Sequence, residues 1–255
     1  PTTANKSLPQ SFIDEMMDNY DEAHRQLYIM GKYVNLTGMR AIYAFERAKL
    51  IPARSRDQIP HALTVGMDFN VDPFCMTGSY MENENKITFD EFFIRNQYGS
   101  GNYASYTDRA MMLLLEKYPN KWYKQNVMND PSLPTYDVSI RPDMTGSQRN
   151  TAANLTDLEI IEKYGVRIDG KHNPQVNVRL KVANVAMNTG RWFVTENCSE
   201  LIKDMEMCVT DGHGDIVKGN VGDDRLRTHL LDAVTYDVFQ EFSDLIIKPK
   251  YGKAI

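Results

Sequence analysis

Three consecutive segments between residues 61 and 94 have the period-two pattern of β-strands, and this pattern constrains the fold more than any other feature of the sequence. The second segment, at about 74–81, and the third, 87–94, are joined by a short polar turn at 82–85. We therefore predict an antiparallel meander of three strands. In the first segment, apolar residues occupy every second position: Leu63, Val65, Met67 and Phe69.

The chain after the meander predicts helices and further strands in alternation. Residues 103–117 have helical spacing and end before Pro119. Residues 136–143 again alternate, and a helix with capping-box spacing follows from Thr156 to Gly165, leading into a short strand at 166–168. A strand, a helix and a strand in this order favour a parallel pair. The expected class is α/β, with a mixed sheet of three antiparallel strands followed by parallel strands, flanked by helices.

The two ends of the chain carry mostly helical patterns. Residues 10–30 predict an amphipathic helix, 33–38 and 41–45 predict short extended pieces around a turn, and the polar stretch 51–57 is the best candidate boundary. We therefore interpret the region before residue 58 as an arm that docks on a larger domain. The remaining expected elements are a helix at 175–188, an extended piece at 192–195, a helix at 199–206, a hairpin at 211–214 and a long helix at 223–242.

Composition excludes several classes of protein. With 255 residues, 42% of them hydrophobic and 25% charged, the chain is long enough for one sizeable core. No apolar run approaches the length of a membrane span, and no secretion signal is visible, although a chain without an initial Met is expected to be a fragment. The net charge of −5 means that any site for a polyanion must be local. The three cysteines are expected to be reduced and structural: Cys75, Cys198 and Cys208.

Three aspartates stand at positions where they can meet. Asp68 and Asp143 each close a predicted strand, and neighbouring parallel strands would place both at one edge of the sheet. Asp232 lies on a polar stripe of the last helix, together with Arg225, His229 and Tyr236.

Three close carboxylates repel one another unless protons or divalent cations neutralise them. Hard oxygen ligands of this kind favour Mg²⁺ or Mn²⁺, and two such ions can support phosphodiester hydrolysis. Asp72, four residues after Asp68, could reach a second metal ion, or it could form a turn with Pro73. The alternative for all three of the main aspartates is that each is a turn or helix-cap residue.

Three motifs resemble those of the nuclease domain of the large terminase subunit of tailed bacteriophages, the DNA-packaging motor. The first is Gly66 to Pro73, similar to the acidic motif of the first strand. The second is Arg141 to Gly146, similar to the fourth-strand turn, although here Pro142 precedes Asp143. The third is His229 to Tyr236, similar to the terminal H-x-x-D-A-x-x-Y helix. The interval from Asp68 to Asp143 is long for this pattern, which implies an insertion within 119–135.

The resemblance implies an RNase H-like fold and a metal-dependent endonuclease acting on double-stranded concatemeric viral DNA during genome packaging. It implies that Asp68, Asp143 and Asp232 are catalytic residues and ligands of two Mg²⁺ or Mn²⁺ ions. The implied partners are DNA, a portal protein and a small terminase subunit. The implied location is the cytoplasm of the bacterial host, without a membrane partner. Residues 1–57 correspond to the linker after an ATPase domain, and residues 58–255 to the nuclease domain.

Contacts with DNA are expected from a local excess of basic residues. Residues 164–195 hold five Lys or Arg against one acidic residue, and Arg179 and Lys181 belong to this set. Lys218, Arg225 and His229 are nearer the aspartates and are candidates for phosphate contacts. A solvated basic surface with no ligand explains the same pattern. The chain has no G-x-x-x-x-G-K-[ST] motif, so we expect no ATP site in it.

Two other functions compete with this interpretation. The first is another RNase H-like nuclease of the resolvase or transposase type, against which the arm resembling the ATPase linker argues. The second is a non-catalytic module that docks on DNA or the portal, with carboxylates that only cap helices.

Overall fold

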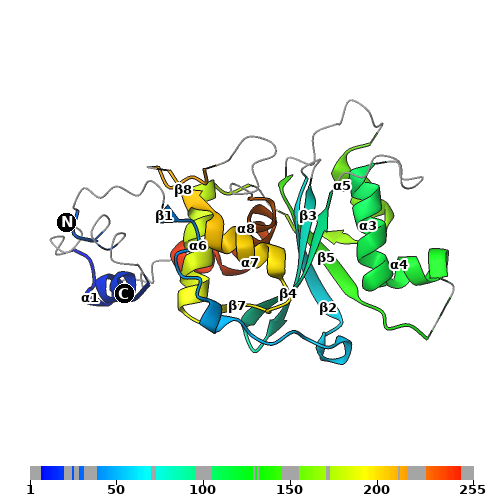
Figure 1. Ribbon diagram of the computed structural model, residues 1–255, viewed down its shortest axis with the longest axis horizontal. Coiled ribbons are helices and arrows are strands. Elements are labelled where there is room, and N and C mark those ends of the chain that lie inside the picture. Colours follow the sequence, from blue (N-terminus) through cyan, green and yellow to red (C-terminus); the bar gives the residue numbers. More distant parts are fainter. Residues whose placement is uncertain are drawn as a thin grey trace, which may run out of the picture.

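The computed structural model describes residues 7–19, 25, 29–31, 39–69, 73–95, 105–128, 130, 132–144, 155–170, 173–211, 213–217 and 228–247. A six-stranded mixed sheet forms the centre of the described part, with helices on both faces (Figure 1). Its strand order is β6-β5-β2-β3-β4-β7. The strands are β2 (Ala62–Asp68), β3 (Phe74–Glu82), β4 (Asn85–Ile94), β5 (Asp137–Pro142), β6 (Arg167–Ile168) and β7 (Trp192–Val194).

The predicted meander is confirmed. Strands β2, β3 and β4 pair antiparallel in sequence order. The tight turn between β3 and β4 places Asn83 and Glu84 at positive φ, which favours a closely connected hairpin. The predicted parallel strands are confirmed as well, since β5 runs parallel to β2, β6 to β5, and β7 to β4.

One face of the sheet is covered by α3 (Tyr106–Lys117) and α5 (Asp157–Lys163) (Figure 1). The side chain of Ser105 caps α3, and the expected capping box of Thr156 and Glu159 opens α5. Gly165, at φ +64°, follows the end of α5, where the sequence predicts the helix to stop. The apolar side of β2 packs here, with Leu63, Val65 and Met67 in the same cluster as the buried residues of α3.

The other face is covered by α6 (Val176–Asn188), α7 (Ser199–Met207) and α8 (His229–Phe242), followed by α9 (Asp244–Ile247) (Figure 1). Their apolar side chains form a second core cluster. The three cysteines lie in it as buried thiols, as expected for cysteines with a structural role. Burial raises the pKa of the Cys198 thiol to about 12.

Residues of the predicted arm are part of this second core. Ala41, Ile42 and Phe45 are buried in it, although the segment has bends and turns instead of the expected extended pieces. The strand β1 (Met39–Arg40) pairs with β8 (Val209–Thr210), and Ile51 adds a parallel bridge to Thr195 beside β7. The division of the chain at residue 57 stays a prediction. Residues of the segment 39–51 nevertheless pack with helices that come after residue 57 in the sequence.

The remaining predictions have mixed outcomes. The first helix, α1 (Gln10–Asn19), covers only the first half of the predicted span, and residues 20–24 lie outside the described part. The expected insertion at 119–135 contains α4 (Lys121–Tyr123) and a π-helical turn at Lys124–Met128. The hairpin near Asp211 is present, with Thr210 bridged to Ile216. None of the described helices is long and apolar enough to span a membrane.

Candidate active site at the carboxyl edge of the sheet

The first two aspartates meet at the carboxyl edge of neighbouring strands, as predicted. Asp68 is the last residue of β2 and is only 6% exposed. Asp143 directly follows β5, the parallel neighbour of β2, and its backbone N–H donates to the carbonyl of Met67 at 2.9 Å. The hydrogen bonding that continues the parallel ladder past β5 therefore places Asp143 beside the end of β2.

The polar side of β2 faces α8 instead of solvent. Three contacts follow in order along the two elements: Asp68 with His229, Gly66 with Ala233, and Thr64 with Asp237. The helical residues are four apart and the strand residues two apart, so the two periodicities match over this length. Of the predicted polar stripe, only His229 takes part in these three contacts, and the other two contacts use Ala233 and Asp237, which the stripe did not include.

Gly66 allows α8 to lie directly against the sheet. A Cβ atom at this position would stand 2.2 Å from the carbonyl oxygen of Ala233 and 3.0 Å from the Thr77 hydroxyl. No side chain fits in that space. Since Ala233 follows Asp232, this close approach also brings Asp232 to the edge where Asp68 ends.

Tyr236 of α8 is within electrostatic reach of all three carboxylates. Burial raises the pKa of its phenol, and the negative charges of Asp143, Asp232 and Asp68 raise it further, while Arg179 opposes them. The sequence placed Tyr236 on the polar stripe but did not predict that the guanidinium of Arg179 lies over its ring, at 4.3 Å from the ring centre.

Asp232 is held by Arg179 of α6. The guanidinium donates from Nη2 to Oδ1 of Asp232 at 2.5 Å, and from Nη1 to the Asp232 carbonyl at 3.1 Å. Both side chains are almost fully buried. Arg179 was expected on a basic surface for DNA; the structure places it in the interior, paired with an aspartate, because a buried charge requires a partner.

Asp143 is held by a residue that the sequence analysis did not single out. The amide of Asn173 donates to Oδ1 of Asp143 at 2.5 Å and accepts from the backbone N–H of Met144 at 2.8 Å. Asn173 thereby fixes the turn after β5 from outside the strand. No local pattern could have revealed this contact or that of Arg179, because both pairs join distant parts of the chain.

His229 is the first residue of α8. Its Nδ1 is 3.6 Å from Oδ2 of Asp68. The start of α8 is fixed by Asp204 of α7, whose carboxylate accepts from the N–H of Leu230 at 3.1 Å. Lys181 is half-buried on α6. Asp72, Lys218 and Arg225 lie outside the described residues.

The donor chemistry of this edge fits a hard divalent cation, but the spacing is not that of a completed metal site. Carboxylate oxygens are the ligands that Mg²⁺ and Mn²⁺ prefer. Within the described residues, however, no three His, Cys, Asp or Glu side chains stand close enough together to hold one ion. Asp143 and Asp232 are instead hydrogen-bonded by Asn173 and Arg179.

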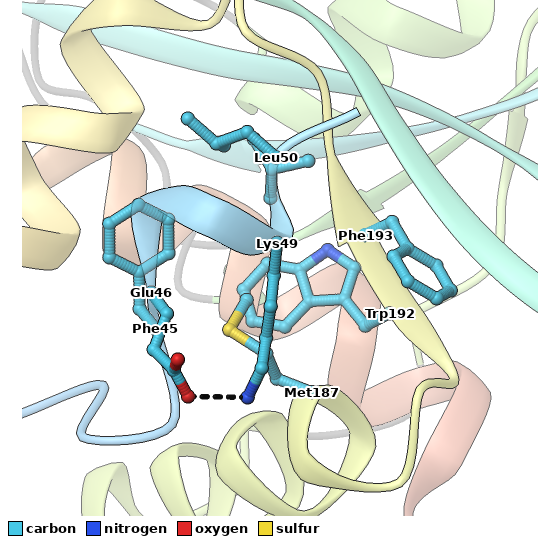
Figure 2. Close-up of a pocket in the computed structure, with 8 residues that line it drawn as sticks. Phe45, Glu46, Lys49, Leu50, Met187, Trp192 and Phe193 are labelled. Carbon is cyan, nitrogen blue, oxygen red and sulfur yellow. Dashed lines mark ion pairs between the residues drawn. The ribbon is translucent and has the colours of Figure 1, made fainter. Parts of the chain in front are cut away.

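A small apolar pocket lies away from this edge of the sheet. It opens between Phe45, the end of α6 at Met187, and Trp192 of β7 (Figure 2). Glu46 and Lys49 form an ion pair of 2.7 Å at this pocket (Figure 2). Its volume of about 20 Å³ has room for about one water molecule, so it is too small for a substrate.

Comparisons with known proteins place the fold. No family model and no curated protein sequence matches the chain. Among solved structures, the large terminase of a thermophilic bacteriophage is similar, with a TM-score of 0.65 and 15% identity, over 93% of this chain and 53% of that one. The same protein in complex with ADP gives 0.66 and 16%. The P22 large terminase nuclease domain gives 0.54 and 15%, over 80% of this chain and 93% of that one.

These likenesses confirm the expected resemblance at the level of the fold. The chain spans about half the length of the thermophilic phage protein and corresponds to nearly the whole P22 nuclease domain. At such low identity the match speaks for architecture and not for chemistry. The chain therefore has an RNase H-like mixed α/β fold, similar to that of the P22 large terminase nuclease domain.

Proposed function

We propose that this chain is a metal-dependent endonuclease that cleaves double-stranded viral DNA during genome packaging. The observation that supports the proposal is the placement of Asp143, which directly follows β5 and bonds to β2 next to Asp68, under the helix α8 that bears Asp232. The likeness to the P22 large terminase nuclease domain supports it. In this account residues 1–57 connect a preceding ATPase domain to the nuclease. The implied partners are a portal protein and a small terminase subunit in the host cytoplasm.

The three aspartates would hold two divalent ions, Mg²⁺ or Mn²⁺, which activate a water molecule and stabilise the leaving oxygen of the phosphodiester. The chain's own residues prepare this site. The 3.6 Å contact of His229 orients Asp68, and Asn173 holds Asp143. We further propose Asp72 as an additional ligand, and Lys181, Lys218, Arg225 and His229 as phosphate contacts. Because Arg179 lies in the interior, we propose that it binds Asp232 and does not contact DNA directly.

The test is cleavage of supercoiled plasmid by the purified chain with Mn²⁺, with Mg²⁺ and with EDTA, with Asp143→Asn in parallel. We expect nicking and linearisation that need the metal and disappear in the variant, because Asn retains the shape but not the charge of Asp143. Cleavage by Asp143→Asn at the parent's rate would remove Asp143 from the site. A preference for branched over linear DNA would favour a resolvase-type nuclease.

A non-catalytic docking module makes the opposite prediction. Its carboxylates would only cap helices, so Mn²⁺ would produce no cleavage and no change in melting temperature. A metal ion bound by the folded state alone raises the melting temperature in proportion to the logarithm of its concentration once the site is saturated. Absence of both effects in the parent chain would reject the nuclease proposal.

A further inference from the structure

The carboxylate of Asp232 accepts a hydrogen bond on each of its two oxygens from within the protein. Nη2 of Arg179 donates to Oδ1 at 2.5 Å, and the hydroxyl of Thr228 donates to Oδ2 at 3.1 Å. All three residues are only 2% exposed, so these contacts are made away from solvent. Hydrogen bonds to a charged group are stronger than those between neutral groups, and together the two contacts fix the direction of the carboxylate.

This direction is not the one that a shared metal ion requires. Asp68 and Asp143 lie at the ends of two neighbouring parallel strands, but among the described residues no three His, Cys, Asp or Glu side chains stand close enough together to hold one ion. The guanidinium of Arg179 also places a positive charge beside Oδ1 of Asp232, and it repels a second cation at that oxygen. The donors of Asp232 therefore compete with a metal ion for this carboxylate.

The guanidinium of Arg179 has further contacts that do not use the carboxylate. Nη1 donates to the backbone carbonyl of Asp232 at 3.1 Å and to the hydroxyl of Thr235 at 3.0 Å. The central carbon lies 4.3 Å from the centre of the Tyr236 ring, a cation–π distance. These three contacts remain if the Asp232 side chain turns to another rotamer. Release of the carboxylate thus needs the rotation of one side chain, while α6 and α8 keep their packing.

From this geometry we propose that Arg179 and Thr228 hold Asp232 in a closed position, and that the three aspartates can share a divalent ion only after the Asp232 carboxylate has turned away from both donors. The inference concerns the regulation of the site and rests on the proposed function. When only a fraction of the molecules has the binding-competent arrangement, the apparent dissociation constant is the intrinsic one divided by that fraction. Weakening the closed position should therefore strengthen metal binding.

The experiment measures the dissociation constant for Mn²⁺ by isothermal titration calorimetry, without DNA, in the parent, Thr228→Val and Arg179→Met. Valine and methionine fill much of the space of the residues they replace but donate no hydrogen bond to Asp232. We expect the dissociation constant to fall about threefold or more in Thr228→Val and about tenfold or more in Arg179→Met. Thr228→Val is the decisive variant, because Arg179→Met also removes a charge that repels the ion through space.

The matched control is Thr107→Val, on the face of the sheet that α3 and α5 cover. Thr107 is also 2% exposed, and its hydroxyl donates to Oδ1 of Asp157 at 2.5 Å. This variant loses the same kind of hydrogen bond at a place with no part in the site, so its dissociation constant should stay within about twofold of that of the parent. Circular dichroism establishes that each variant is folded.

The outcomes separate this inference from the nuclease proposal. If Thr228→Val binds Mn²⁺ as the parent does, or more weakly, the two donors do not hold Asp232 in a closed position, and the inference is overturned while the nuclease proposal stands. If no chain binds Mn²⁺, the proposed function fails, and the inference fails with it. If Arg179→Met does not fold, Thr228→Val and its control decide alone, because loss of one hydroxyl leaves the buried charge pair in place.

Discussion

At the scale of single residues, the most consequential position in the site is one that lacks a side chain. Gly66 lets α8 approach β2 so closely that a Cβ would meet the backbone of Ala233. Backbone atoms cannot rotate away as the end of a side chain can. The position of Asp232, the residue before Ala233, thus depends on the absence of atoms at Gly66.

Gly66→Ala should therefore destabilise the fold by about 1–3 kcal/mol, as overpacking of a close interface does. Gly78→Ala is the matched control in the adjacent strand, because its added Cβ would stand at an ordinary 3.4 Å from Asp90. The measurement is the free energy of unfolding from urea titrations of both variants. Equal stability of the two would show that α8 does not rest on Gly66 as described.

At the scale of elements, α8 is fastened to the sheet by a buried group of charges. Lys86 of β4 and Asp237 of α8 are 2.8 Å apart and fully buried. Arg141 of β5 bonds both Asp237, at 3.1 Å, and Glu241, at 2.8 Å. The charges balance, and their directional contacts fix how α8 lies across the strands that carry Asp68 and Asp143.

Asp237→Asn should lower the free energy of unfolding by about 3–5 kcal/mol at pH 7, because Lys86 loses its buried counterion. Glu206→Gln, which breaks the exposed pair with Arg47, should cost less than about 1 kcal/mol. Urea titrations measure both. A small effect of Asp237→Asn would mean that the pair does not hold α8.

The same carboxylate predicts a dependence on pH. Burial alone would raise the pKa of Asp237, but the charges of Lys86 and Arg141 outweigh it and keep the pKa below the ordinary 3.8. A pKa lowered by folding contributes stability above the unfolded-state value and loses it as the pH falls through the folded-state value. Below pH 4 the parent should lose stability more steeply than Asp237→Asn; parallel curves of unfolding midpoint against pH would contradict this.

In addition to the pairing of β1 with β8, one buried side-chain amide holds the segment before residue 58. Asn184 of α6 accepts from the N–H of Ala44 and donates to the carbonyl of Ala41, each at 2.9 Å. Asn184→Ala should leave both backbone groups without a hydrogen bond. Each unsatisfied group should lower the free energy of unfolding by about 1–3 kcal/mol. Faster limited proteolysis within residues 39–51, together with a lower unfolding midpoint, is the expected result. Unchanged proteolysis would show that the segment is held elsewhere.

The strands, the helices and the edge where Asp68 and Asp143 meet could be predicted because local periodicity and strand direction determine them. The partners of the aspartates could not. Arg179 and Asn173 contact Asp232 and Asp143 across the fold, and no spacing along the chain encodes such pairs. For Arg179, charge counting indicated an exposed surface, whereas the side chain is buried, because counting charges does not distinguish a solvated cation from a paired one.

At the scale of the whole molecule, the sheet separates two apolar clusters and carries the candidate site at one edge (Figure 1). Ala41, Ile42, Ala44 and Phe45 belong to the cluster on the α8 side, so a chain begun at residue 58 would lose part of that core. The element that joins all of these parts is α8, which bears Asp232 toward one end and Asp237 in its middle. These two buried aspartates have different tasks in the proposed account.

The most direct test of the account is the rise in melting temperature caused by Mn²⁺ in Asp232→Asn and in Asp237→Asn. Both variants replace a buried aspartate of α8 by its amide, so they differ in place and not in chemistry. We expect Asp237→Asn to melt earlier than the parent but to keep the increase produced by Mn²⁺. Asp232→Asn should lose that increase. A full increase in Asp232→Asn would contradict the claim that the three aspartates form one metal-binding site.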